Sequence, residues 1–199
     1  MNKKHILGAV IAVGIILSGC APSKPVSEHI KHAKQVTEAD IFKSSKENEK
    51  LEKSELDASI KKYIKVNNQI EGRKIQIQQE LDKQSNSKEK VTKEQKRDLI
   101  ELEKNAEHNQ RNFLHYFRKN TLPDGYKDNL ERLTQYYAAL NAPLDDVEQK
   151  IKELNYSPKN SINVVDVPTQ FVSDVNGKTQ EKIKVFLKEQ HIDTSAFEY

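Results

Sequence analysis

The chain has 199 residues, of which 35% are hydrophobic and 32% are charged, and it contains one cysteine. The formal net charge is only +3, and acidic and basic residues are interleaved, which excludes the basic stripe of a nucleic-acid-binding protein. A single cysteine excludes a disulfide scaffold, and the low apolar content favours long helices with a narrow apolar seam over a compact α/β fold.

Residues 1–19 have the layout of a secretory signal peptide. Lys3 and Lys4 form a basic start, an apolar run extends from Ile6 to Leu17, and small residues precede Cys20. The apolar run is too short to span a bilayer core, which needs roughly twenty residues. A plain secretory signal would leave Cys20 as a free thiol in an oxidising compartment, which is a liability, so we expect Cys20 to be modified.

The segment Leu17-Ser18-Gly19-Cys20 resembles the lipobox of bacterial lipoprotein precursors at all four positions. The resemblance implies that the Cys20 thiol receives a diacylglyceryl group and that cleavage makes Cys20 the first mature residue. The expected location is therefore the extracytoplasmic face of the cell membrane, with a lipid anchor at Cys20 as the contact with the membrane. The abundance of Lys, Asn, Ile and Gln is similar to that of proteins from AT-rich Gram-positive genomes.

The next segments are expected to connect the anchor to a helical body. Residues 20–26 contain Pro22 and Pro25 and form an extended tether. Ser27 and Glu28 are candidates to cap a first amphipathic stretch, whose apolar side would carry Ile30, Ala33, Thr37 and Ile41. Residues 43–50 interrupt this spacing, and a helix break or a helix continuation both fit them.

Two heptad seams then predict an antiparallel helical hairpin within residues 27–122. The loop between them is expected at residues 84–88, and Asn67 and Asn109 are candidates to pair across the hairpin. Because each seam finds its partner within the chain, we expect a monomer. The first seam is Leu56, Ile60, Tyr63, Asn67, Ile70, Lys74, Ile77 and Leu81; the second is Leu99, Leu102, Ala106, Asn109, Phe113 and Tyr116.

Residues 123–199 are expected to form a small C-terminal helical unit. Pro123-Asp124-Gly125 is a turn signal, and Asn141 is a predicted helix cap. A final helix is expected to start after Asn176-Gly177 and to end near His191. Residues 162–167 are expected to form an extended strip or short strand, and Ile192, Phe197 and Tyr199 to dock. The predicted fold is mainly α: a hairpin of coiled-coil character packed on this unit, with at most a short extended segment. The helix that follows the turn carries Tyr126, Leu130, Leu133, Tyr137 and Leu140.

Candidate chemistry is sparse. Glu28, His29 and His32 share a helix face, but zinc sites usually need three or four protein ligands, so we expect no metal and no cofactor. His108 and His115 are expected to join an exposed ion-pair network with Glu107, Arg111 and Arg118. Residues 85–88 match the Ser-x-x-Lys form of some acyl enzymes without its accompanying elements, and we expect no catalytic residues.

Tyr136 and Tyr137 are the candidate binding residues. Adjacent helical positions point about 100° apart, so one of the two is expected to be exposed. The favoured function is a non-catalytic binding or scaffold protein of the cell envelope with a cell-wall or protein partner, similar to small helical cell-wall-binding lipoproteins of Gram-positive bacteria. An accessory subunit of an envelope membrane complex, chaperone-like or regulatory, and a host-factor-binding protein remain alternatives.

Overall fold

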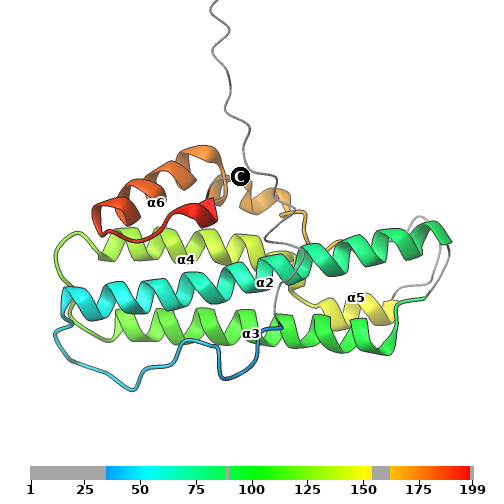
Figure 1. Ribbon diagram of the computed structural model, residues 1–199, viewed down its shortest axis with the longest axis horizontal. Helices are drawn as coiled ribbons and strands as arrows, with labels where there is room; N and C mark the ends of the chain where they lie inside the picture. The colour runs from blue at the N-terminus through cyan, green and yellow to red at the C-terminus, as the bar shows by residue number, and fades with distance from the viewer. Residues whose placement is uncertain (1–34, 88–89, 154–161, 198–199) are drawn as a thin grey trace, which may run out of the picture.

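The structure, a computed structural model, describes residues 35–87, 90–153 and 162–197 (Figure 1). Over these ranges the chain is mainly helical and has no β-strand, which confirms the predicted fold class. The predicted signal peptide, Cys20 and the tether lie outside the described residues. The elements, with η for 3₁₀ helices, are α2 (Lys53–Ser87), α3 (Lys93–Arg118), α4 (Lys127–Asn141), η1 (Ala142–Leu144), α5 (Val147–Glu153), η2 (Thr169–Asp174), α6 (Gly177–Glu189) and η3 (Ser195–Phe197).

Helices α2 and α3 form the predicted antiparallel hairpin. Ser59 of α2 lies opposite Tyr116 of α3, whereas Arg73 further along α2 pairs with Asp98 near the start of α3. Every predicted position of both seams is buried, including the polar ones. The heptad spacing therefore identified the contact face of both helices.

The connection between α2 and α3 begins later than expected. The loop was predicted at residues 84–88, but α2 continues to Ser87. This segment contains neither glycine nor proline, and its polar residues disfavour a helix only weakly, so packing of the preceding turns extends it. Helix α3 starts after Thr92, which forms a capping box with Gln95.

Lys74 explains why a charged residue stands in the first seam. Its side chain is fully buried, and its Nζ donates to the Glu71 carboxylate at 2.8 Å and to the backbone carbonyl of Leu140. Leu140 lies in the last turn of α4, where backbone carbonyls lack helical partners and the helix dipole favours a cation. Lys74 thus joins α2 to the C-terminal end of α4.

Helix α4 lies along the hairpin as a third helix (Figure 1). The turn before it places Gly125 at φ +80°, a conformation that favours glycine. The Gln110 side chain donates to the Thr134 carbonyl at 3.1 Å, and Arg118 pairs with Glu131 at 2.6 Å, so α4 runs antiparallel to α3. The three helices form a bundle.

The chain after α4 differs from the prediction at Asn141. Its side chain was expected to cap the next helix, but it instead donates to the Asn67 Oδ1 at 3.0 Å and makes no cap hydrogen bond. Asn141 is the last residue of α4 and faces α2, which places its amide beyond reach of the following turn. Helix α5 then packs along α3.

Residues 162–167, expected to be an extended strip or short strand, form no strand, and the chain bends at 164–166, where the Val165 and Asp166 amides donate to the Asn163 side chain at 2.9 and 2.7 Å. Ile162 and Val164 are buried, and the Gln78 side chain donates to the Ile162 carbonyl at 3.2 Å and accepts from the Val164 amide at 2.9 Å. One amide side chain of α2 thus takes the place of a neighbouring strand. The segment lies across the helix rather than in a sheet.

The C-terminal helix and tail lie close to the prediction where they are described. Helix α6 starts at Gly177, one residue earlier than expected, because Asn176 caps it by accepting from the Thr179 amide at 2.9 Å. After α6 the chain turns back, and Ile192 and Phe197 are buried against the bundle. Tyr199 lies outside the described residues.

Two buried apolar clusters hold the bundle together. The first, near the C-terminal end of α3, is rich in aromatic rings, and Tyr63 stacks on Phe113 with ring centroids 4.2 Å apart. The second occupies the other half of the hairpin and includes Ile70, Leu99 and Val164. Residues from before and after position 123 contribute to both clusters, so the C-terminal segments share one core with the hairpin.

Candidate functional site

The most distinctive arrangement is an extended segment, residues 35–52, that runs along α3; we call it the strap. A helical stretch was expected through Ile41, but residues 35–41 are not helical, and the earlier part of that stretch lies outside the described residues. A parallel bridge joins Lys50 to Thr121, just past the end of α3, so the strap and α3 run in the same direction (Figure 1).

Apolar side chains fix the strap to the bundle. Val36, Ile41, Phe42 and Leu51 are each at most 3% exposed. The Phe42 ring packs edge-on against Phe113 of α3, with ring centroids 5.2 Å apart. It lies at the same centroid distance from the Tyr116 ring of α3. The apolar residues of the strap are spaced irregularly because an extended chain on a helix meets a new hollow at each step. A helical spacing would not have placed these four side chains on one buried face.

A row of asparagines on one side of α3 binds the strap backbone. Asn105 donates to the Val36 carbonyl at 2.9 Å, and Asn112 donates to the Phe42 carbonyl at 2.9 Å. Asn109, fully buried between them, accepts from the Phe42 amide at 3.1 Å. An amide side chain offers both a donor and an acceptor, so it can satisfy backbone groups that lack a neighbouring strand.

Asn109 also connects the strap to α2. Its Nδ2 donates to the Tyr63 carbonyl at 3.3 Å, and Asn67 donates to the same carbonyl at 3.0 Å. The predicted pairing of Asn67 with Asn109 is therefore wrong in detail, because the two amides share one acceptor instead of bonding to each other. Asn109 thus joins α3, to which it belongs, with both the strap and α2.

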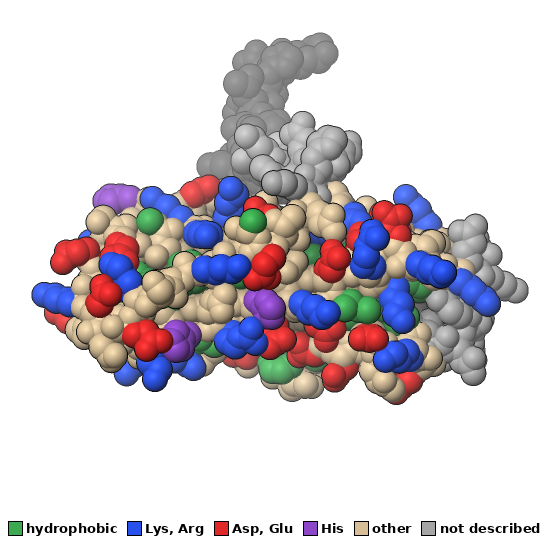
Figure 2. All heavy atoms as spheres, turned by 90° about the horizontal axis from the view of Figure 1, so that it is seen from below, with side chains coloured by type: hydrophobic (Ala, Val, Ile, Leu, Met, Phe, Trp, Pro, Cys, Tyr) green, Lys and Arg blue, Asp and Glu red, His purple; other side chains and the backbone are tan. Residues whose placement is uncertain are grey.

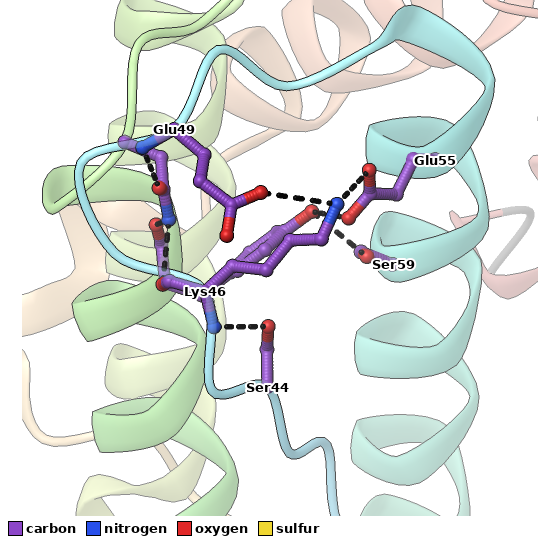
Figure 3. Close-up of polar contacts among 7 residues, drawn as sticks. Ser44, Lys46, Glu49, Glu55 and Ser59 are labelled. Carbon is purple, nitrogen blue, oxygen red and sulfur yellow. Dashed lines mark hydrogen bonds and ion pairs between the residues drawn. The ribbon is translucent and has the colours of Figure 1, made fainter.

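The C-terminal part of the strap ends in a polar cluster (Figure 3). Lys46 Nζ lies 2.7 Å from the Glu55 carboxylate of α2 and 3.5 Å from Glu49. The Tyr116 hydroxyl donates to Glu55 at 3.2 Å and accepts from Ser59 at 3.4 Å. The cluster thus links the strap, the start of α2 and the end of α3.

Charges in this cluster are fixed by their partners. The hydrogen bond from Lys46 holds the pKa of the Glu55 carboxyl below its usual range and raises the pKa of Lys46 in return. Burial raises the pKa of the Tyr116 phenol, so that group stays neutral and donates its proton. A charged pair beside a neutral phenol is suited to holding a segment in place.

The strap changes its mode of attachment at Asn48. Beyond this residue three backbone–backbone hydrogen bonds join it to the segment after α3: Asn48 to Lys119 at 2.8 Å, Thr121 to Glu49 at 2.8 Å and Leu51 to Thr121 at 2.9 Å. Asn48 itself has φ +58°, a left-handed conformation that asparagine tolerates better than most residues. Before Asn48 the strap is bound mainly by side chains of α3, and from Asn48 onward it is bound by a short ladder of backbone hydrogen bonds.

Both histidines of α3 face the strap. His108 Nδ1 lies 3.5 Å from Glu38, and His115 Nε2 lies 2.7 Å from Glu47. The expected network is thus divided, since Arg111 pairs with Glu107 but Arg118 pairs with Glu131 of α4. On the face seen from below, acidic and basic side chains are intermixed (Figure 2).

The expectation that Tyr136 or Tyr137 is exposed was wrong. They are 4% and 3% exposed, and their rings pack edge to face. Helix α4 is covered on two sides, by the hairpin and by α6 with the tail, so adjacent positions both face packed neighbours. Tyr137 donates to Asn68 of α2 at 3.1 Å, and Gln180 of α6 donates to Tyr136 at 3.1 Å.

Metal ligands and membrane-spanning helices were searched for in the described residues. No group of three His, Cys, Asp or Glu side chains there could hold a metal ion, and Glu28, His29 and His32 lie outside. Within the same part of the chain, no helix combines the length and apolar character needed to cross a membrane. Cys20 also lies outside the described residues.

Sequence reasoning missed the strap and its asparagine row. The available signal was the spacing of Asn105, Asn109 and Asn112, which places three amides on one side of α3. No family profile, curated protein or solved structure matches this chain. The site is therefore interpreted from its own geometry.

Replacement of Asn109 with alanine should destabilise the protein by about 2 kcal/mol, because it leaves the buried Phe42 amide without an acceptor. Urea unfolding monitored by circular dichroism measures this loss. Asn129→Ala is the control, since that half-buried side chain bonds within the α4 region, donating to the Gly125 carbonyl at 2.8 Å and accepting from Arg132 at 2.7 Å, and its cost should be smaller, about 1 kcal/mol or less. Equal losses in the two variants would contradict the assigned role.

The strap should loosen in acid. The pKa of Glu55 is lowered from its ordinary value of 4.5 when Lys46 is docked, so docking gains stability above that pH and loses it as the pH falls through the lowered value.

Titration of the Glu49 backbone amide from pH 5 to 3 by NMR reports docking, because this amide donates to Asn120 at 2.8 Å. Glu55→Gln should flatten the titration, whereas the exposed control Glu52→Gln should not. The idea fails if the two variants titrate alike.

Proposed function

We propose that the chain is a lipoprotein, anchored through Cys20 to the extracytoplasmic face of the cell membrane, that acts as a non-catalytic binding or scaffold protein of the envelope. The observation that carries this proposal is the four-residue lipobox Leu17–Cys20, which follows a complete signal layout and contains the single cysteine of the chain. Two acyl chains would hold the protein on the membrane without a spanning helix.

The strap supports this proposal. Residues 20–34, between the proposed anchor and the first described strap residue, span at most about 50 Å when extended. Gln35 then bonds to Glu101 in α3 at 2.9 Å, and Val36 is buried. A pull on the anchor would therefore reach the bundle through side chains of α3, as a protein held at a surface requires.

A groove between α4 and α6 offers a place where partner contact can be mapped. Its volume is about 520 Å³, and its lining combines the apolar residues Val185 and Phe186 with charges of both signs: Arg132, Lys178, Lys182, Glu181 and Glu189. Val185 is 46% exposed. An apolar floor with a charged rim is the usual anatomy of a protein contact surface.

The alternatives have less support. The accessory-subunit hypothesis relied on exposed aromatic residues between Tyr116 and Tyr137 and on the strip 166–171. The five aromatic rings in the first of these regions are buried: Tyr116, Phe117, Tyr126, Tyr136 and Tyr137. That hypothesis and host-factor binding remain outcomes of the binding experiment below rather than separate proposals.

Expression of the full chain in a Gram-positive host should give a protein that is labelled by an alkyne fatty acid and stays with the membrane fraction. Cys20→Ser should lose both the label and membrane retention, because the acceptor thiol is gone. Ser18→Ala is the control, since alanine also fits the lipobox pattern and should leave labelling intact. Labelled C20S protein would refute the anchor.

Residues 21–199 immobilised on beads should retain either purified cell wall or one component of solubilised membranes in a saturable manner. Val185→Lys tests the groove, and replacement of residues 84–90 by a glycine-serine loop tests the hairpin tip. Loss of retention in only one of the two variants identifies the groove or the hairpin tip as the binding surface. Retention of a membrane complex would favour the accessory subunit, and retention of neither material would refute an envelope-binding role.

A further inference from the structure

We propose that the strap is a releasable extension of the tether: residues 35–47 detach from α3 under tension from the anchor, whereas the backbone ladder at 48–51 and the helical bundle stay intact. The proposal rests on the anchor at Cys20 proposed above. It concerns the mechanics of the described residues, which can be measured without the lipid.

The direction of the strap determines the order in which its contacts are loaded. The strap runs from the level of Glu101 to that of Thr121, parallel to α3, and the anchor segment joins it at residue 35. Tension therefore acts first on the Gln35 and Val36 contacts, then on Phe42, and last on the ladder.

The two parts of the strap differ in what holds them. Between residues 35 and 47 the bonds to the bundle come from side chains: asparagines of α3 bind residues 36–42, and Lys46 and Glu47 pair with Glu55 and His115. Buried apolar contact in this part comes from Val36, Ile41 and Phe42. From Asn48 to Leu51 three backbone–backbone bonds attach the strap to residues 119–121. The change occurs at the left-handed Asn48, which marks the boundary of release.

The bundle keeps most of its core when residues 35–47 leave. The aromatic cluster contains one residue from this part of the strap, Phe42, and the second cluster contains only Val36. The seam contacts between α2 and α3 and the packing of α4 on both helices do not pass through the strap. Local opening of a segment with few core contacts is the usual low-energy event in a folded protein.

Release would nearly double the reach of the tether. Before release the connection consists of residues 20–34, at most about 50 Å long; afterwards it consists of residues 20–47, at most about 95 Å long. The bundle could then follow a partner that moves away from the membrane without unfolding.

Single-molecule force spectroscopy on the unlipidated chain from Cys20 to Tyr199 tests this. The Cys20 thiol provides one handle, and Lys119→Cys, an exposed position beside the ladder, provides the other. Thirteen freed residues extend to about 45 Å but cover about 22 Å when docked, so a first transition should lengthen the molecule by about 20 Å before the bundle opens.

Asn112→Ala removes one strap bond and should make the first transition roughly 2- to 10-fold faster at a given force, with the second unchanged. Asn129→Ala, in the first turn of α4, where the side chain bonds to Gly125 and Arg132, should change neither. A single transition in which strap and bundle yield together would overturn the proposal. Because no lipid is used, that result is separate from the C20S result, which tests the anchor.

Discussion

Buried backbone groups of an extended segment need hydrogen-bond partners, and in the described residues, which form no β-sheet, side chains supply many of them. This requirement shapes the molecule in two places. Asn105, Asn109 and Asn112 bind the strap, and Gln78 binds residues 162–164. Amide side chains suit both tasks because each carries a donor and an acceptor. Two extended segments can therefore complete a helical core that would otherwise be open on two sides.

Side chains that combine apolar and polar parts explain how a chain with so little apolar content forms a buried interior. Tyrosines supply large apolar rings, and their hydroxyls still reach polar partners at the edge of the core. Tyr63 contacts Gln110, Tyr137 contacts Asn68, and Tyr126 contacts Asp57 of α2 at 2.7 Å. Lys74 follows a similar logic, with its charge directed at a helix end. The polar seam residues are thus parts of contacts between helices.

The hairpin, α4 and α6 were predictable because their apolar spacing matches the helical period and because Asn176 and the turn at Pro123–Gly125 are strong local signals. The strap was not predictable, since its course depends on hollows in α3 some seventy residues later in the chain. The burial of Tyr136 and Tyr137 was missed for a related reason: a sequence shows one helix face, whereas α4 is covered from two sides. Of the candidate site, only the polar spacing on α3 was visible in advance.

The separation between the strap and its binding surface also sets an order of folding. Hydrogen bonds between the strap and the α3 region join residues 66 to 74 positions apart. A chain that emerges from its N-terminus, during synthesis or export, cannot dock the strap until α3 has followed it. Residues 35–51 thus remain undocked throughout that interval. If Cys20 is modified as proposed, this interval is when the modifying enzyme would act before the strap binds α3.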